Sequence, residues 1–199
     1  SNPQLLLVRA DAPYKTYGEL VAHAKANPGK LNYGSSGIGS VPHLAVVALA
    51  KAANIDVFHV PHKGEADALA SILGGHITMF VSHPTFMTAH ADKIRALFVL
   101  APNRLPDHPN VPTIVEQGGP ALSFEVWGGL AVPKGTPAPV LAALENACKV
   151  ATSSEAFTKQ MQTLQTPVKY LDGKSFASFV AAEFERNGRL LRESGIPKE

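Results

Sequence analysis

The sequence predicts an α/β fold: a mostly parallel sheet with helices on both faces, followed by a stretch of helices alone. Short apolar runs alternate with helical segments up to residue 102, a pattern typical of parallel strands joined by crossover helices. After residue 133 nearly every segment has helical periodicity, and no later strand is predicted to cover these helices. The strands needed by the last helices are therefore expected to lie outside this chain.

The first half of the chain supplies the predicted sheet. Residues 5–8 form a continuous apolar run, which indicates a buried strand. Thr16 and Glu19 have the spacing of a capping box, which predicts a helix that begins there and ends near residue 27. Apolar patterns and turn residues predict the remaining strands at 31–33, 57–60, 77–81 and 96–100, and helices after residue 40, at 65–73 and at 84–90.

The pattern changes after residue 102. A proline-rich connection leads to a second capping box, Thr113 to Glu116, and then to a strand predicted at about 124–132. Three helices follow, with predicted starts at residues 136–137, at Ser153 or Ser154, and near Asp172.

Composition excludes several classes of protein. The chain has 199 residues, of which 45% are hydrophobic and 17% charged, so it is not an intrinsically disordered tail. Its net charge of +2 does not suggest a nucleic-acid partner. A single cysteine, Cys148, excludes a disulfide framework, and neither HExxH nor a CxxC pair predicts a metal site. No apolar run reaches membrane-spanning length, no signal peptide precedes the first strand, and no cofactor is predicted.

A glycine- and serine-rich loop, residues 34–40, is the most informative stretch. It joins a predicted strand to a predicted helix, where free backbone amides and the helix dipole favour an anion. The hydroxyls of Ser35, Ser36 and Ser40 could add hydrogen bonds to a ligand. The alternative is an ordinary tight turn with Ser40 as the helix N-cap. Its glycine spacing does not match the dinucleotide-binding motif.

A second loop, residues 59–64, also lies between a predicted strand and a helix. Lys63 could add a cation beside the helix amides, although a solvated surface lysine is the simpler interpretation. His43 either belongs to the core or lines the ligand site formed by these two loops. Trp127 could line a pocket or belong to the core.

Catalysis has little support in the sequence. There is no G-x-S-x-G motif, so no catalytic residue is assigned. An alternative function, a Ser/His hydrolase acting at the glycine–serine loop, would need a general base near Ser35 or Ser36, and only His43 or His59 could serve. A third alternative is an interaction or regulatory module of the same fold that binds no ligand.

Several motifs in order resemble the Bug family, the periplasmic substrate-binding proteins of tripartite tricarboxylate transporters. They are residues 24–40 followed by His43-Leu44, then 59–64, 73–75, 111–113, 127–130 and 135–137. The resemblance implies a type II periplasmic-binding fold that captures a small carboxylate for membrane transporter subunits. It implies ligand contacts from Gly34, Ser35, Ser36, Gly37, Ser40, Lys63 and Gly64, with His43 and Trp127 as weaker candidates. The absence of arginine from both loops agrees with carboxylate binding by amides and hydroxyls.

The resemblance also implies how the chain is divided. Residues 1–132 would form the second lobe, a three-layer α/β/α unit with its crossing strands. Residues 133–199 would be helices completing a first lobe that is otherwise largely missing, and these uncovered helices are expected to promote self-association. Two departures from the family pattern concern the ligand. His62 stands where the family usually has tyrosine, and the acidic residue often found after the strand at 79–83 is absent, which favours a plain carboxylate over an amino acid.

Overall fold

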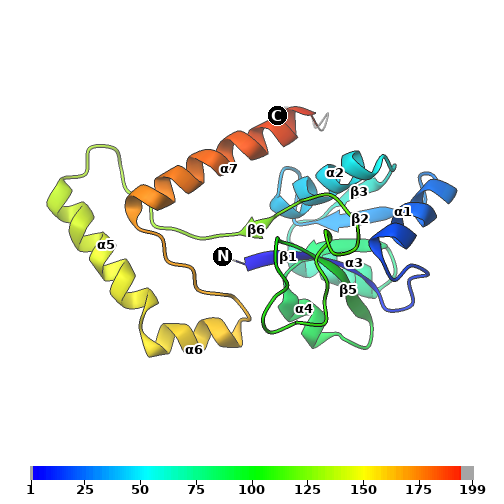
Figure 1. The fold of residues 1–199 in the computed structure, drawn as a ribbon, viewed down its shortest axis with the longest axis horizontal. Helices are drawn as coiled ribbons and strands as arrows, with labels where there is room; N and C mark the ends of the chain where they lie inside the picture. Colours follow the sequence, from blue (N-terminus) through cyan, green and yellow to red (C-terminus); the bar gives the residue numbers. More distant parts are fainter. Residues whose placement is uncertain (1, 194–199) are drawn as a thin grey trace. The chain divides into compact units, whose positions relative to one another are not determined.

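A computed structural model describes residues 2–193 of the protein, and these residues divide into two compact units. We call residues 3–126 with 189–193 the sheet unit, and residues 2 and 127–188 the helical unit. Figure 1 shows the secondary-structure elements of both along the chain.

The sheet unit is built on one mixed sheet. Its strands are β1 (Asn2–Arg9), β2 (Asn32–Ser35), β3 (Phe58–Pro61), β4 (Met79–Ser82), β5 (Ile94–Leu100) and the short β6 (Glu125–Val126). The strand order is β3-β2-β4-β1-β5, and β6 pairs with β1. β2 is parallel to β3 and to β4, whereas β1 is antiparallel to both β4 and β5. The expected mostly parallel sheet is therefore corrected in one respect: β1 runs against its neighbours, because strand direction depends on partners distant in sequence.

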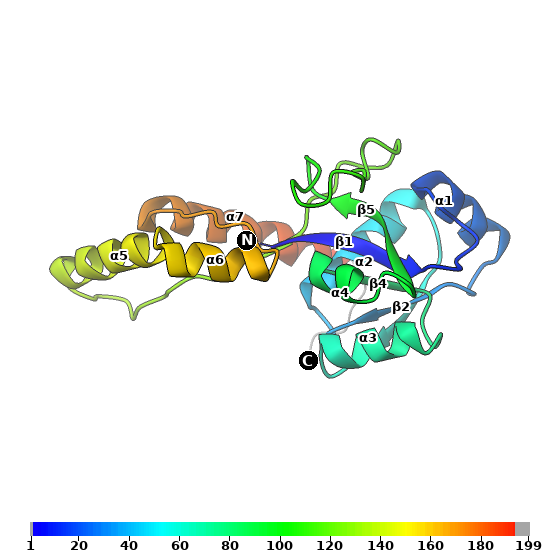
Figure 2. The ribbon, with the colours of Figure 1, turned by 90° about the horizontal axis from the view of Figure 1, so that it is seen from below.

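Helices cover both faces of this sheet, as predicted. The helices are α1 (Tyr17–Ala26), α2 (Val41–Ala53), α3 (Glu65–Leu73) and α4 (Pro84–Ala89). One apolar core contains side chains of α1 and α2, and the other contains side chains of α3 and α4. Figure 2 shows α3 on the opposite face of the sheet from α1 and α2. The alternating side chains of β1 explain this arrangement, because Leu6 and Val8 enter the first core while Leu5 and Leu7 enter the second.

One predicted element is wrong, whereas the second capping box is confirmed. The strand expected at 124–132 is reduced to the two residues of β6, and the backbone from residue 127 to 132 is irregular and mostly exposed. A strand needs a hydrogen-bonding partner, and the described residues offer none to this segment. The second capping box makes both of its hydrogen bonds, Glu116 N–H to Thr113 Oγ1 at 3.1 Å and Thr113 N–H to Glu116 Oε2 at 2.7 Å, but only turns follow it.

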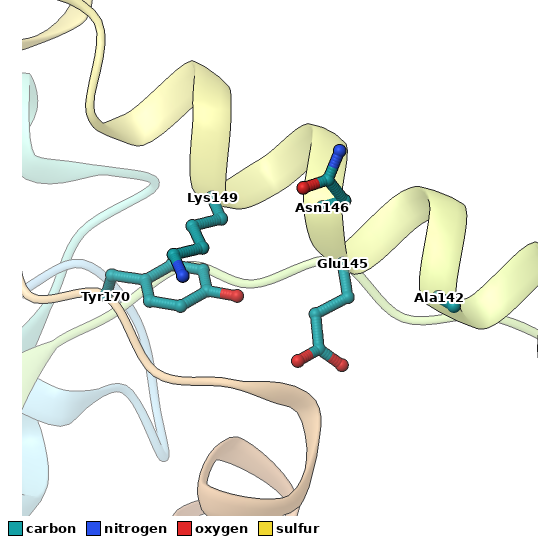
Figure 3. Close-up of a pocket in the computed structure, with 5 residues that line it drawn as sticks. All are labelled: Ala142, Glu145, Asn146, Lys149 and Tyr170. Carbon is teal, nitrogen blue, oxygen red and sulfur yellow. The ribbon is translucent and has the colours of Figure 1, made fainter.

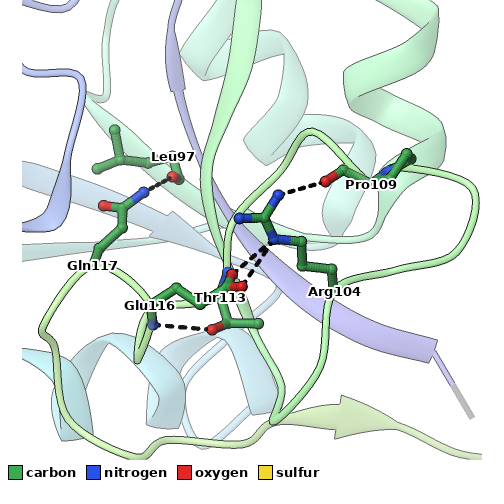
Figure 4. Close-up of polar contacts among 6 residues, drawn as sticks. All are labelled: Leu97, Arg104, Pro109, Thr113, Glu116 and Gln117. Carbon is green, nitrogen blue, oxygen red and sulfur yellow. Dashed lines mark hydrogen bonds and ion pairs between the residues drawn. The ribbon is translucent and has the colours of Figure 1, made fainter.

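Polar contacts hold the connection formed by residues 101–119 together, and one of them joins it to the sheet (Figure 4). Arg104 Nε donates to both oxygens of Glu116, at 3.0 and 2.8 Å, and Arg104 Nη1 donates to the carbonyl of Pro109 at 2.7 Å. Gln117 Nε2 donates to the carbonyl of Leu97 in β5 at 2.8 Å. These bonds, rather than a helix, fix the connection after β5. Hydrogen bonding to Arg104 also lowers the pKa of Glu116.

The helical unit contains α5 (Ala138–Thr152), α6 (Glu155–Thr163) and α7 (Gly173–Glu193), the last of which continues into the sheet unit at residue 189. All three predicted starts are confirmed within one or two residues. Ser154 Oγ accepts from Phe157 N–H at 3.3 Å, and Asp172 Oδ1 accepts from Ser175 N–H at 2.7 Å. No residue of α5 or α6 is buried, so the apolar face expected on α5 has no cover within the described part of the chain.

Candidate functional site

The glycine–serine loop is built around the hydroxyl of Ser35, the last residue of β2. Ser35 is fully buried, and its Oγ donates to the carbonyl of Gly37 at 2.9 Å. The same Oγ accepts from Gly37 N–H at 3.2 Å and lies 2.7 Å from His59 Nε2. Because the one serine proton is directed at Gly37, Nε2 of His59 is the donor in its contact with Ser35. Ser35 therefore fixes the conformation of the loop through its hydrogen bonds to Gly37 and His59.

Two stacked imidazoles support the loop on the α2 face of the sheet. The ring centroids of His43 and His59 are 3.8 Å apart with the planes inclined by 20°, and Tyr33 stacks on His59 at 4.9 Å. His43 Nδ1 accepts from the N–H of Gly39 at 3.0 Å. Burial lowers the pKa of His43, and burial with the nearby charges of His43 and His62 lowers the pKa of His59 to about 4. Both rings are thus neutral at neutral pH, as their hydrogen bonds require.

Much of the loop's own hydrogen-bonding capacity is used internally. Ser40 Oγ donates to the carbonyl of Gly37 at 2.7 Å, and Ser40 N–H donates to the same carbonyl at 3.3 Å. Gly37 and Gly39 have φ values of 129° and 75°, which favour glycine. The loop is therefore preformed. Of its three serines, Ser36 alone has a half-buried side chain with no hydrogen bond in the structure described.

The second predicted loop lies beside the first. The N–H of His62 donates to the carbonyl of Ser35 at 3.0 Å, which joins the ends of β2 and β3. Lys63 is exposed, and Gly64 is the N-cap of α3. The carboxyl ends of β2, β3 and β4 thus share one edge of the sheet, where ligands of open α/β folds commonly bind.

The helices that begin at this edge, α2, α3 and the short α4, lack side-chain caps. Neither Ser40 at the start of α2 nor Gly64 at the start of α3 makes a side-chain capping bond. By contrast, Thr16 caps α1 and Ser154 caps α6 with their hydroxyls. Free N-terminal amides carry partial positive charge, so this edge of the sheet attracts anions.

Four further residues at the same edge were not assigned to the site from the sequence: Ser82, His62, His83 and Glu65. Ser82, the last residue of β4, is fully buried and its Oγ has no hydrogen-bond partner in the described structure. The Nδ1 atoms of His62 and His83 are likewise buried and unpaired. Glu65, in the first turn of α3, pairs with His83 Nε2 at 3.0 Å. The sequence carried a signal for these residues, because each lies at the end of a predicted strand or at the start of a predicted helix.

The geometry gives the hydrolase alternative no support. His59 does lie within hydrogen-bond reach of Ser35, as that alternative required. However, Ser35 is fully buried and its proton is directed at Gly37, so it is not available as a nucleophile. Among residues 2–193 no group of three or more His, Cys, Asp or Glu side chains is arranged to hold a metal ion. None of the helices described is long and apolar enough to cross a membrane.

Trp127 lies in the helical unit, where it packs edge-on against the rings of Phe176 and Phe179 with centroid distances of 5.5 and 5.4 Å.

A hollow of about 270 Å³ in the helical unit is lined by Ala142, Glu145, Asn146, Lys149 and Tyr170 (Figure 3). Burial and the neighbouring carboxylates of Glu145 and Asp172 raise the pKa of Tyr170. Four of these five lining residues lie on the exposed helix α5, so this hollow is an open surface depression.

Comparison with known proteins decides the family. A family model described as the tripartite tricarboxylate transporter family receptor, TctC, matches residues 1–196. The chain belongs to this family. The resemblance to Bug proteins is thereby confirmed, and a Bordetella pertussis relative named BugT is 28% identical over 198 residues.

Curated relatives show what share of a related protein's length this chain covers. The UPF0065 protein in the gbd 5' region of Cupriavidus necator is 31% identical over 194 residues, which cover 97% of this chain and 59% of that protein. The chain thus spans about three fifths of the length of most of these curated relatives.

Solved structures confirm the predicted fold. The periplasmic binding protein BugD has 26% sequence identity and a TM-score of 0.84, and the match covers 100% of this chain and 68% of BugD. R. palustris Rpa4515, solved with adipate, has 25% identity and a TM-score of 0.83, over 98% of this chain and 66% of that one. The α/β fold of a periplasmic binding protein is therefore shared along essentially the whole chain.

Proposed function

We propose that this chain is part of an extracytoplasmic solute-binding protein that captures a small carboxylate and delivers it to the membrane subunits of a tripartite tricarboxylate transporter. Membership of the receptor family and the likeness to BugD support this proposal. By the same likeness we place the protein in the periplasm. The adipate bound to Rpa4515 supports a carboxylate as the class of ligand.

One observation carries the proposal: a preformed loop and two uncapped helix starts meet at one edge of the sheet. A preorganised set of donors binds an anion without the entropic cost of ordering a loop. The residues proposed to line the site are those predicted from the sequence within the sheet unit: Gly34, Ser35, Ser36, Gly37, Ser40, His43, Lys63 and Gly64. Within this set, Ser36 and the exposed Lys63 are proposed as direct contacts, while Ser35 and His43 position the loop.

We further propose that the protein has no catalytic role. The buried and internally bonded Ser35 supports this view. The experiment is to incubate the protein with ester and phosphate substrates and to measure turnover. Turnover that disappears in a Ser36→Ala variant would contradict the proposal.

The exposed apolar side chains of the helical unit support a further proposal, that residues 1–199 self-associate. Val140, Leu141 and Val150 on α5 are exposed, and Phe184 on α7 has 77% of its surface exposed. Such a concentration of exposed apolar surface is uncommon in a stable monomer. Sedimentation at several concentrations should show oligomers, and a monomer at all concentrations would contradict this part of the proposal.

The test of the main proposal is calorimetric titration of the longest form of the protein that its gene encodes, with mono-, di- and tricarboxylates. We expect one carboxylate to bind with micromolar or tighter affinity and residues 1–199 alone to bind it much more weakly. Native mass spectrometry of the purified protein should find the same ligand. A protein that binds no carboxylate in either measurement would refute the proposed function and favour the ligand-free module.

A further inference from the structure

The sheet has one side that is covered and one side that is open. On the covered side, Val99 N–H in β5 donates to the carbonyl of Pro112 at 2.9 Å, and Ile114 N–H donates to the carbonyl of Val99 at 3.0 Å. On the other side β3 is the last strand in the order β3-β2-β4-β1-β5, and among residues 2–193 no strand pairs with its outer side. We call residues 57–61, which are β3 and the residue before it, the open edge.

The pairing of β3 with β2 shows which backbone groups of the open edge are already used. Phe58 N–H donates to the carbonyl of Leu31 at 2.8 Å. His62 N–H, just after the strand, donates to the carbonyl of Ser35 at 3.0 Å. In a parallel pair every second residue bonds to the neighbouring strand, and the residues between direct both backbone groups away from it. The even-numbered residues from 58 to 62 therefore face β2, and the odd-numbered residues face outward.

The outward-facing backbone groups are complementary to those of a second copy of the chain. They are the N–H groups of Val57 and His59 and the carbonyls of Val57, His59 and Pro61, and within the described residues none has a hydrogen-bond partner. In an antiparallel pair centred on His59, the two His59 residues exchange both hydrogen bonds. Each Val57 N–H then donates to the Pro61 carbonyl of the other copy. Four hydrogen bonds form, and every outward N–H of both chains is used.

The side chains of the open edge fit the same pairing. Phe58 has 66% of its surface exposed although it lies in a strand. The pairing places it opposite Val60 of the second copy on the α3 side of the sheet, and it places Val57 opposite Pro61 on the α2 side. Aromatic and β-branched residues in such pairs stabilise a sheet. Residues 57–61 contain no Asp, Glu, Lys or Arg, the residues that commonly prevent edge strands from pairing.

The charges that flank the open edge are complementary in this arrangement. Asp56 precedes the edge and Lys63 follows it, and both are exposed. Neither makes an ion pair in the part of the chain that the structure describes. Antiparallel pairing centred on His59 places Asp56 opposite His62 of the second copy and beside its Lys63. One contact between opposite charges is therefore expected at each end of the pair.

Two features limit the strength of such a pair. The open edge is short, and Pro61 removes one donor, so the Val57 carbonyl has no partner in the dimer. Interfaces that bury less than about 1,200 Å² are typical of transient complexes. We propose that β3 pairs with β3 of a second copy, which joins two sheet units into a weak twofold dimer. This inference depends neither on the proposed function nor on the exposed face of the helical unit.

Disulfide cross-linking tests the register directly, on the longest form of the protein that its gene encodes. Two variants, Phe58→Cys and Val60→Cys, each also carrying Cys148→Ser, are mixed and mildly oxidised. Residues 58 and 60 of the two copies face each other in a pair without mutual hydrogen bonds, where Cβ atoms approach closely enough for a disulfide. We expect a cross-linked dimer. In the control mixture, Ala70→Cys on the exposed side of α3 replaces Val60→Cys and should give little product. No dimer, or equal yields in both mixtures, would overturn the inference.

Sedimentation at several concentrations measures the strength of the pair. Phe58→Lys should weaken the dimer about tenfold, because two apolar contacts are lost and two charges are introduced. Asp56→Lys should weaken it about threefold, and adding Lys63→Asp should restore it. Val150→Lys, at an exposed apolar position of α5, is the matched control and should leave the cross-linking between residues 58 and 60 unchanged.

The outcomes separate this inference from the proposed function. A double charge variant as weak as Asp56→Lys would overturn the antiparallel arrangement, and Phe58→Lys that associates like the wild type would overturn the use of this edge. A protein that binds a carboxylate yet stays monomeric at all concentrations would overturn the inference and leave the proposed function standing. A protein that forms the 58–60 cross-link but binds no carboxylate would refute the proposed function alone.

Discussion

Lowering the pH should destabilise the sheet unit through His59. Its folded pKa is about 4, whereas a histidine in the unfolded chain titrates near 6.5. Between these values the unfolded state binds a proton that the folded state does not, so the free energy of unfolding falls as the pH falls. The full stability is present above pH 6.5. About 1 kcal/mol is lost by pH 5.5 and about 3 kcal/mol by pH 4.

The assay compares urea unfolding of wild-type protein with that of His59→Gln at pH 7.5, 5.5 and 4.5. The glutamine amide keeps a donor for Ser35 but does not titrate, so the variant should lose less stability on acidification. Carboxylates titrate in both proteins, and the difference between them therefore isolates His59. His76→Gln, at an exposed position, is the control and should follow the wild type. Equal losses in wild type and His59→Gln would refute the reasoning.

Three further predictions concern packing and capping. Gly34→Ala places a Cβ 2.4 Å from Ile77 Cδ1 and should reduce the free energy of unfolding by about 1–3 kcal/mol in urea melts, with partial recovery when Ile77→Val is added. Thr16→Ala removes the cap of α1 and should reduce it by about 1 kcal/mol by the same measurement. Gly129→Ala places a Cβ 2.1 Å from the ring of a neighbouring phenylalanine and should alter the emission of the single tryptophan, whereas Gly128→Ala, with open space around it, should not.

Each of these predictions has an outcome that would contradict it. No recovery in the double variant at Gly34 and Ile77 would mean that the clash is not with Cδ1. Unchanged stability in Thr16→Ala would mean that the 3.2 Å bond from Glu19 N–H to Thr16 Oγ1 contributes nothing measurable. Equal emission changes in the two glycine variants would show that the aromatic packing around Trp127 is not what the fluorescence reports.

Local signals predicted the elements of the sheet unit well. The apolar run at 5–8 identifies β1, and the capping box at Thr16 identifies the start of α1. Both signals depend on residues a few positions apart, which is why the sequence reveals them. The capping box at Thr113 shows the limit of such signals. Its two hydrogen bonds form, yet no helix follows, because the segment is held instead by contacts to Arg104 and to the carbonyl of Leu97.

The sequence predicted where the candidate site lies in the fold, but not which side chains contact one another there. Strand–loop–helix order indicated the loops at 34–40 and 59–64, and the register of β2 with β3 brings them together. The sequence could not show that Ser35 bonds to His59, which is 24 residues away, nor that the rings of His43 and His59 stack. Both contacts depend on the pairing of β2 with β3 and the packing of α2.

The sequence alone determined the family, the α/β fold and the two loops that carry the proposed site, because these depend on motifs and on local periodicity. The tertiary structure decided the direction of β1 and the shortness of β6, because strand pairing depends on partners far along the chain. It also decided which side chains use their hydrogen-bonding groups within the fold. Burial and hydrogen bonding use Ser35 and His43 within the fold and leave the hydroxyl of Ser82 unpaired, and only packing in three dimensions makes that distinction.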